Sequence, residues 1–158
     1  MAPKQKHISP ADNQAAIKIR RAKSSDAAQI AELCGQLGYP AKPAEIAERL
    51  LEIKSAHQHA VLVAESSERK VLGWLHVSVS PLLEVELRAE VNGLIVDGEE
   101  RSRGTGALLL RAAEQWARSR GCKSTSVRSN VIRERAHQFY LRHGYEHYKT
   151  QKAFRKPL

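Results

Sequence analysis

The sequence predicts an α/β fold in which a mixed β-sheet has helices on both of its faces. Segments of alternating apolar residues, typical of strands, are interspersed with segments whose apolar residues recur at helical spacing. The predicted order is strand, two helices, three strands, helix, strand, helix and strand, which implies a mixed sheet covered on both sides. The chain has 158 residues, of which 42% are hydrophobic and 27% charged. We therefore expect one domain with one core.

The first half of the chain predicts a strand, two helices and a hairpin. Residues 1–16 are polar and without periodicity, so we expect a flexible tail before a single domain over 17–158. Ser24 to Asp26 supplies N-cap chemistry for the first helix, and Gly38 ends it. Pro81 closes the hairpin. The predicted elements are strands at 17–21, 59–65, 70–80 and 86–96 and helices at 26–37 and 43–53.

The second half predicts two helices and the strands around them. A helix follows Gly106 and ends near Gly121, and a strand covers 122–128. Ser129 or Asn130 is predicted to cap the next helix, and Gly144 to end it. The alternation over 145–156 predicts a last pair of strands with a break near Thr150.

Composition excludes several classes of protein. No apolar run approaches the roughly 20 residues that cross a bilayer, and the N-terminus lacks the apolar core of a signal peptide, so we expect a cytoplasmic protein. Two cysteines, Cys34 and Cys122, are too few for a disulfide framework and are interpreted as small buried residues. The seven histidines show no ligand spacing, so no metal is expected. The net charge of +9 raises nucleic acid or another polyanion as a partner.

A glycine loop lies between the strand that ends at Val96 and the following helix. Gly104 and Gly106 let backbone N–H groups approach an anion at the positive end of the helix dipole, and Arg101 and Arg103 add charge-assisted hydrogen bonds. A ligand with a pyrophosphate is the first hypothesis. No lysine follows either glycine as in a P-loop, and Leu109 occupies the third glycine position of a dinucleotide loop. Both of those alternatives are therefore disfavoured.

Two motifs resemble the signatures of the GNAT superfamily of acyl-CoA N-acyltransferases. The first is Arg101-x-x-Gly104-x-Gly106, and the second is Asn130 followed by A-H-Q-F-Y-L-R-H-G-Y over 136–145. The resemblance covers roughly residues 88–146. It implies acetyl-CoA as co-substrate, an amine as acceptor and, as is common in this superfamily, a homodimer. The coenzyme-binding residues that it implies are Leu94, Ile95, Val96, Arg101, Ser102, Arg103, Gly104, Thr105, Gly106, Ala107 and Asn130.

The resemblance also assigns the chemistry. Tyr140 is the expected general acid for the departing thiolate, and its alternative role is packing beside Phe139. Glu90 is the candidate base, acting through water, because the period of two places it on the same strand face as Val96. A water chain or another residue could serve instead. Cys122 as an acyl-carrying nucleophile would give a ping-pong reaction, but nothing near it in sequence activates it.

The sequence therefore predicts an N-acetyltransferase that moves acetyl directly from acetyl-CoA to an amine, with small molecules favoured as acceptors. Acetylation of protein N-termini or lysines is the alternative within the same chemistry. A basic module that binds nucleic acid, or regulates, on the same fold is the rival from another class, and nucleic acid is the less favoured partner. The rival predicts binding that weakens steeply with salt.

Overall fold

The computed structural model of the protein describes residues 16–158 and divides the chain into two compact units. The first unit ends at Val127, and the second covers Arg128–Leu158. Residues 1–15, which make up nearly all of the expected tail, lie outside the described residues. Within 16–158, no helix is long and apolar enough to cross a membrane.

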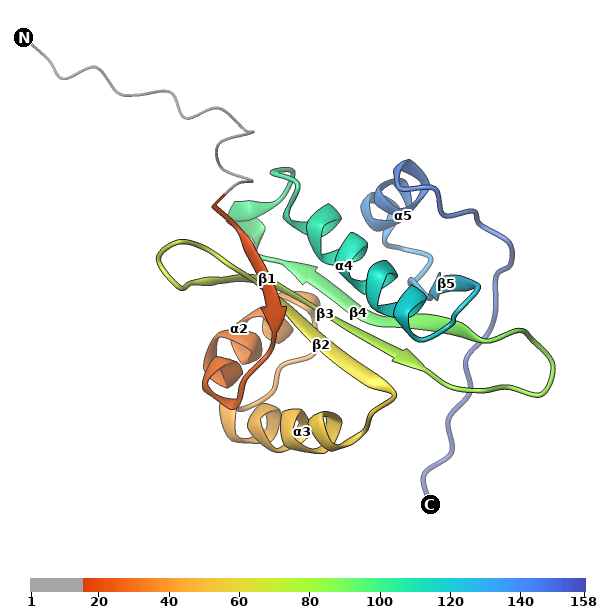
Figure 1. Ribbon diagram of the computed structural model, residues 1–158, viewed down its shortest axis with the longest axis horizontal. Helices are drawn as coiled ribbons and strands as arrows, with labels where there is room; N and C mark the ends of the chain where they lie inside the picture. Colours follow the sequence, from red (N-terminus) through yellow and green to blue (C-terminus); the bar gives the residue numbers. More distant parts are fainter. Residues whose placement is uncertain (1–15) are drawn as a thin grey trace, which may run out of the picture. The chain divides into compact units, whose positions relative to one another are not determined.

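The first unit contains a five-stranded sheet whose strands follow one another in sequence order (Figure 1). Neighbouring strands are antiparallel except β4 and β5, which are parallel because α4 crosses between them. The strands and α-helices predicted for this unit are confirmed, and none of their ends is shifted by more than about two residues. The confirmed elements are β1 (Lys18–Arg21), α2 (Ala27–Leu37), α3 (Pro43–Ser55), β2 (His59–Glu65), β3 (Val71–Val79), β4 (Arg88–Val96), α4 (Thr105–Ser119) and β5 (Ser124–Val127). Two short 3-10 helices, η1 (Ser24–Asp26) and η2 (Gly98–Glu100), were not predicted.

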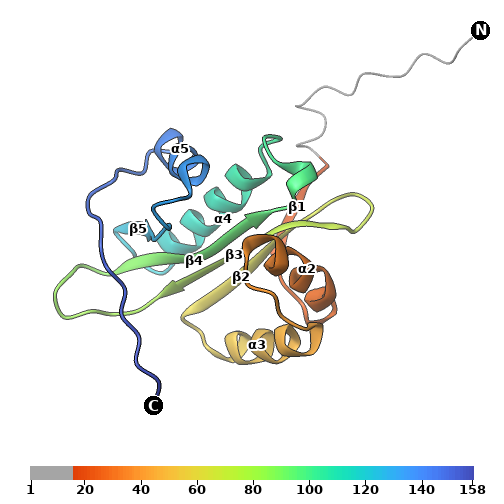
Figure 2. The same cartoon turned by 180° about the vertical axis from the view of Figure 1, so that it is seen from behind.

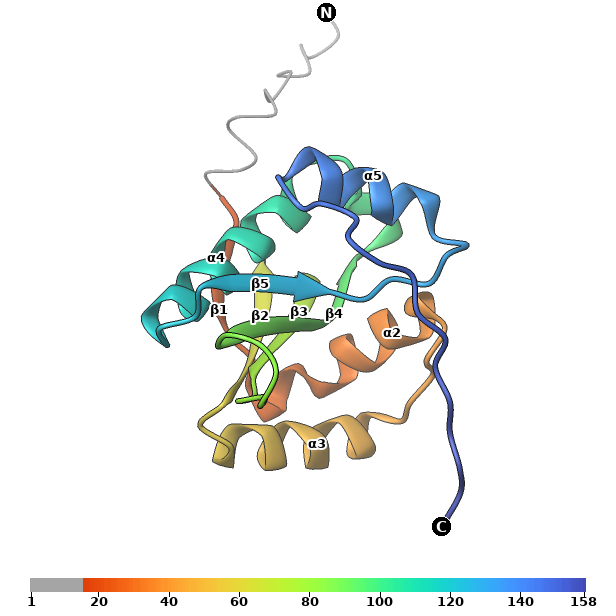
Figure 3. The same cartoon turned by 90° about the vertical axis from the view of Figure 1, so that its right-hand side faces the viewer.

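Helices cover both faces of this sheet, as the sequence predicts. Figure 3 shows α4 on one side of the strands and α2 and α3 on the other, and Figure 2 shows the same layers from behind. Leu109 and Leu110 of α4 are almost fully buried, as is Leu75 of β3. Ile30 and Leu33 of α2 join a core on the opposite face. Each such side chain contributes about 1.5–3 kcal/mol by its removal from water.

An ion cluster fastens the first strand to its neighbours. The Arg20 guanidinium donates to both carboxylate oxygens of Asp26, at 2.8 and 2.9 Å, and its Nε donates to Glu65 at 2.9 Å. Hydrogen bonds from Arg20 hold the pKa of both carboxyl groups below their usual values. Asp26, which is 4% exposed, also accepts the Lys23 N–H and so closes the turn before α2.

A β-bulge interrupts the pairing of β3 and β4. His76 lies opposite Gly93, but Val77 lies opposite Val91, so β4 carries one extra residue at this point. The bulge needs a small residue, because a Cβ on Gly93 would lie 2.8 Å from the Trp74 ring. A bulge bends its strand and reverses the alternation of side chains beyond it. On a given face of the sheet, the side chains of β4 therefore come from even-numbered residues on one side of the bulge and from odd-numbered residues on the other.

The second unit contains α5 (Glu134–Arg142), and two predictions about it are wrong. Neither Ser129 nor Asn130 caps this helix: its N-cap is Arg133, and Asn130 forms a turn instead, with its Oδ1 accepting the Ile132 N–H at 3.2 Å. The predicted strand pair over 145–156 is absent, since residues 143–158 form neither helix nor strand. The predicted stop is confirmed: Gly144, with φ of +83°, directly follows the C-cap residue.

Candidate active site

The glycine loop lies between β4 and α4, as predicted, and its backbone is shaped by two left-handed residues. Gly104 has φ of +87° and is the N-cap of α4, while Ser102 has φ of +66°. A left-handed serine costs about 1 kcal/mol or more, so its neighbours must impose this conformation. Left-handed residues alternating with others turn successive N–H groups toward one side, which is the geometry of an anion-binding nest.

The first turn of α4 presents unused backbone donors. Its first hydrogen bond joins the Leu108 N–H to the Gly104 carbonyl at 3.1 Å, so the preceding amides have no partner inside the helix. No side chain within the described range 16–158 caps this end. The Thr105 hydroxyl is unpaired within residues 16–158, but it is buried and therefore closed to a ligand in this conformation. Fifteen residues of helix add the positive end of their dipole at the same place. These donors fit the oxygen atoms of a phosphate group.

The two arginines of the loop are exposed and make weak contacts. Arg101 Nε donates to the Val96 carbonyl at 3.3 Å. Arg103 Nη1 lies 3.4 Å from Glu100 Oε2, and its side chain remains 55% exposed. Replacing such contacts by contacts to a phosphate costs little free energy, because exposed ion pairs contribute only about 0–1 kcal/mol to stability. Both guanidinium groups are therefore available to a ligand at the start of α4.

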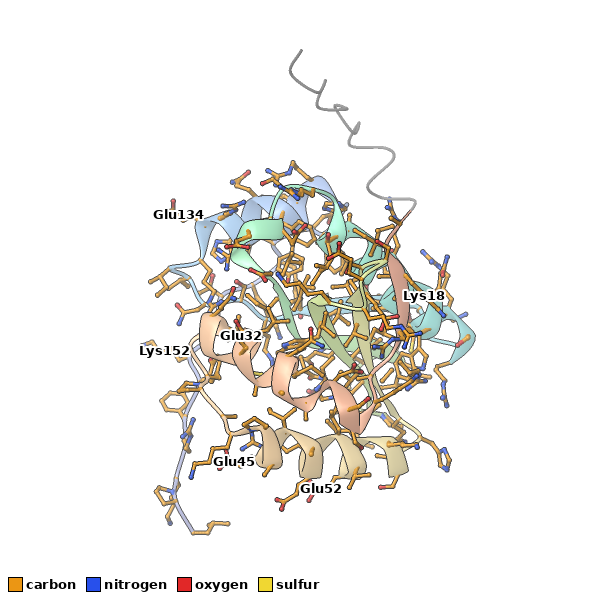
Figure 4. All side chains as sticks on the ribbon, turned by 90° about the vertical axis from the view of Figure 1, so that its left-hand side faces the viewer. Lys18, Glu32, Glu45, Glu52, Glu134 and Lys152 are labelled. Carbon is orange, nitrogen blue, oxygen red and sulfur yellow. The ribbon has the colours of Figure 1, made fainter. Side chains whose placement is uncertain are left out.

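Three residues that no sequence pattern indicates, Gln36, Lys70 and Asp97, form a clasp that holds the loop on the rest of the unit. Gln36 of α2 accepts the Gly98 N–H through its Oε1 at 3.0 Å, and Lys70 lies 3.3 Å from Asp97. The Glu99 N–H donates to Asp97, and this bond together with Lys70 lowers the pKa of the Asp97 carboxyl. These residues line a cavity of about 350 Å³ together with Glu32, which is labelled on α2 in Figure 4.

The end of β4 offers a strand edge beside the loop. Its pairing with β5 covers Arg88 to Val91, opposite Ser124 to Val127, and no further residues of the first unit. Leu94 to Val96 remain paired with β3 on their other side. The first unit therefore leaves one edge of this segment for backbone hydrogen bonds to a ligand.

Glu90 does not share a face with Val96, so that part of the sequence interpretation is wrong. Glu90 lies opposite Ser78, whereas Val96 lies opposite Gly73, five residues away on β3. Side chains an odd number of residues apart on a strand point to opposite faces of the sheet. Glu90 and Val96 are an even number of residues apart on β4, but the bulge between them reverses the alternation. Ser78 in turn accepts a hydrogen bond from the Asn92 amide at 2.8 Å. Glu90 is partly buried in this polar neighbourhood.

Tyr140 and Asn130 belong to the second unit. Tyr140 is partly buried and packs edge-on to Phe139, with ring centroids 5.3 Å apart, and lies 5.6 Å from the Tyr145 ring. Burial raises the pKa of Tyr140 to about 12, although the charge of Arg133 opposes this shift. The phenol is therefore fully protonated at neutral pH. The Asn130 carbonyl accepts the Arg133 N–H at 3.0 Å and orders the turn before α5.

Other reactive groups contribute little. Cys122 is only partly buried, in contrast to the prediction for it, whereas Cys34 is buried as predicted. Burial raises the pKa of the Cys122 thiol, so it is a poor nucleophile at neutral pH. Over residues 16–158, no three His, Cys, Asp or Glu side chains gather as ligands for a metal ion.

Comparison with known proteins agrees with this geometry. The model of the acetyltransferase (GNAT) family matches residues 26–145. The chain is similar to aminoglycoside N(6')-acetyltransferase type 1 of Klebsiella aerogenes, with 33% identity over 72% of this chain and 76% of that protein. It is also similar to aminoalkylphosphonate N-acetyltransferase of Salmonella typhimurium, with 39% identity over 40% of this chain and 43% of that protein.

The fold is shared with solved structures. The structure of AAC(6')-Iy in complex with the bisubstrate analogue CoA-S-monomethyl-acetylneamine superposes with a TM-score of 0.79, covering 90% of this chain and 99% of that one at 18% identity. This likeness concerns the fold, whereas the family model and the Klebsiella relative concern the sequence itself. The chain therefore belongs to the GNAT family of acetyltransferases and is an N-acetyltransferase.

Proposed function

We propose that the protein binds acetyl-CoA at the start of α4 and transfers the acetyl group directly to the amine of a small molecule. The observation that carries this proposal is the uncapped first turn of α4, entered through a left-handed Gly104. In this proposal the pyrophosphate lies on the amides of Gly104 to Ala107, with Arg101 and Arg103 on its oxygens. The coenzyme's extended arm pairs with Leu94 to Val96, and Asn130 is a further coenzyme-binding residue in this proposal.

The acceptor is assigned to small molecules because of the relatives. One is named for aminoglycosides and another for aminoalkylphosphonates, and both acceptors are small and carry a primary amine. Relatives at 33% and 39% identity support this class but do not choose among its members.

In the proposed reaction the amine nitrogen attacks the thioester carbonyl, and the carbon–sulfur bond breaks. The amine first loses a proton to water, which passes it to Glu90. Since Glu90 lies on the strand face opposite to Val96, an intervening water is required rather than direct contact. An N–H of the β4 edge stabilises the oxyanion as it forms.

Tyr140 is proposed to donate a hydrogen bond to the leaving sulfur. Complete proton transfer from a phenol of pKa about 12 to an alkyl thiolate of pKa about 8.5 is uphill by roughly 3.5 units, or about 5 kcal/mol. The phenol therefore stabilises the developing charge, and the thiolate takes its proton afterwards from water. A charge-assisted hydrogen bond of this kind contributes about 1.5–3 kcal/mol.

The test is release of coenzyme thiol from acetyl-CoA in the presence of single amines. Aminoglycosides and aminoalkylphosphonates form one group, and peptides with a free N-terminus or lysine form the other. We expect turnover with at least one small amine, and coenzyme binding in the micromolar range by calorimetry. Turnover with peptides alone would transfer the function to protein acetylation. Absence of coenzyme binding at millimolar concentration would contradict the proposal itself.

The cytoplasmic location and the homodimer stay predictions of the sequence. Cell fractionation and analytical ultracentrifugation test them directly.

A further inference from the structure

A second pocket of the first unit lies far from the acetyl-CoA loop. Its volume is about 310 Å³, and it opens where β1 and α3 end, where β2 begins and just beyond the end of α4. Strands β2 and β4 run in the same direction, because each is antiparallel to β3. His59 begins β2 and Val96 ends β4, so the pocket and the loop lie at opposite ends of the sheet.

The lining of this pocket combines basic side chains with an apolar floor. Leu50 and Val61 are buried, and Ile53 is partly buried beside them. Among residues 16–158, no acidic side chain lines the pocket. The basic residues that line it are Arg21, Lys54, His57, His59 and Arg120.

No carboxylate of the described part of the chain pairs with the cations of this pocket. The ion pairs formed within residues 16–158 use Arg20, Lys70 and Arg103, and none involves a residue of the pocket. The neighbours Arg20 and Arg21 show the contrast. Arg20 is enclosed by two carboxylates, whereas Arg21 is exposed and donates to the His59 carbonyl at 3.2 Å. An anion that enters the pocket therefore meets positively charged side chains that form no ion pair within residues 16–158.

Aromatic and imidazole rings hold this lining in place. The guanidinium carbons of Arg120 and Arg21 lie 5.2 and 6.0 Å from the centroid of the Trp116 ring. The His59 ring is held by a hydrogen bond between its Nδ1 and His76 Nε2, at 3.0 Å. Side chains that are already oriented lose less entropy when they bind a ligand.

We propose that this pocket binds a small organic anion, in which a phosphate or carboxylate group is joined to an apolar ring or short chain. The anionic group is held by Arg21 and Arg120, and the apolar part lies on Leu50, Ile53 and Val61. The volume is at the lower end of the range for small-molecule sites, which fits a ligand of about one ring. The site requires neither acetyl-CoA nor the proposed acceptor.

The test is a calorimetric titration with phenyl phosphate at saturating acetyl-CoA, so that the loop at the start of α4 is occupied. We expect Arg21→Gln and Arg120→Gln each to weaken binding about tenfold, the loss expected for one charge-assisted hydrogen bond. Inorganic phosphate, which lacks the apolar part, is expected to bind about tenfold more weakly than phenyl phosphate. If acetyl-CoA does not bind, the titration still reports on this pocket, so the two proposals fail separately.

Two further variants separate a built pocket from surface charge. Arg118→Gln removes a charge from an exposed residue in the last turn of α4 that does not line the pocket, and binding should not change. Ala56→Trp keeps every charge but fills the pocket, at a C-cap residue whose extended backbone accepts any side chain, and binding should be lost.

Three results would overturn the proposal. The first is absence of phenyl phosphate binding by the wild type at about 10 mM. The second is binding that survives both arginine substitutions and Ala56→Trp. The third is binding of a short DNA duplex, weakened as much by Arg118→Gln as by Arg21→Gln, with phenyl phosphate unable to compete. That result would make the basic face a nonspecific surface for polyanions.

Discussion

The two ends of α4 both carry arginines and a left-handed glycine, yet they are built to meet an anion in different ways. At the first end, Gly104 leaves backbone N–H groups uncapped, and Arg101 and Arg103 stand beside them. At the second end, Gly121, with φ of +78°, follows the helix, and Arg120 is exposed next to carbonyl groups.

The difference shows how much of an anion site the backbone can supply. The helix dipole favours an anion at the start of α4 and opposes one at its end. Basic side chains at the end of a helix also stabilise that end, so part of their charge serves the fold. We therefore expect glycine substitutions to dominate binding at the first end and arginine substitutions to dominate at the second.

The largest expected effect comes from a side chain in the loop. Gly104→Glu places a carboxylate against the uncapped amides at a left-handed position, and we expect acetyl-CoA affinity to fall at least a hundredfold by calorimetry. Gly121→Glu is the matched control, since it introduces the same side chain at a similar φ at the other end of the helix. Equal losses in both variants would show that strain, rather than the anion site, explains the result.

Arg20 and Arg21 provide the next comparison, between a paired and an unpaired cation. Arg20→Gln leaves Asp26 without its partner, and we expect the free energy of unfolding to fall by about 3 kcal/mol, against less than about 0.5 kcal/mol for Arg21→Gln. Denaturant titration measures both. Similar values for the two variants would contradict the contrast between them.

The ion cluster of Arg20, Asp26 and Glu65 makes the stability of the fold depend on pH. The pKa of Asp26 and that of Glu65 are lowered in the folded protein, so their stabilising effect is fully present above the unfolded-state value of about 4. It is lost as the pH falls through the lower folded-state values. In Arg20→Gln this acid-dependent loss of stability should be smaller than in the wild type, which thermal unfolding between about pH 3 and 6 would reveal.

Tyr140→Phe separates chemistry from coenzyme binding. Loss of the proposed hydrogen bond to the leaving sulfur should lower kcat about 10- to 100-fold while the affinity for acetyl-CoA changes by less than about twofold. Phe139→Leu is a control for packing, because the two rings are in contact. Full activity of Tyr140→Phe would refute the role of the phenol.

The smallest effect concerns the clasp that positions the loop. Gln36→Ala removes one hydrogen bond to the Gly98 N–H, at 3.0 Å, and should weaken acetyl-CoA binding about three- to tenfold without changing kcat. Gln29→Ala, which removes a similar bond from α2 to the Val71 N–H at 2.8 Å, controls for the effect on the fold. Unchanged affinity in Gln36→Ala would mean that the loop keeps its shape unaided.

Sequence patterns predicted the first unit closely because its signals are local. Gly38 ends α2 and Pro43 begins α3 by backbone preference alone, and the apolar period of α4 is continuous from the glycine loop. The second unit was predicted less well. Asn130 has the chemistry of an N-cap, but the same side chain forms a turn equally well, and which of the two occurs depends on the residues that follow.

The predicted strand pair over 145–156 failed for a related reason. Alternation shows that a segment could line a sheet, but a strand exists only when a neighbouring edge pairs with it. No such pairing is formed by residues 143–158. The prediction of the face on which Glu90 lies failed because of one inserted residue. The period of two holds only along an uninterrupted strand, and the sequence does not reveal the bulge beside Gly93.

The sequence by itself determined the order of elements in the first unit, the glycine loop at the start of α4 and the family, because each rests on residues adjacent along the chain. The tertiary structure decided which face Glu90 occupies, that Gln36 and Lys70 hold the loop, and that Arg21 and Arg120 line one pocket. These residues are brought together by strand register and helix packing. Both depend on the free energy of the whole fold, which no local pattern records.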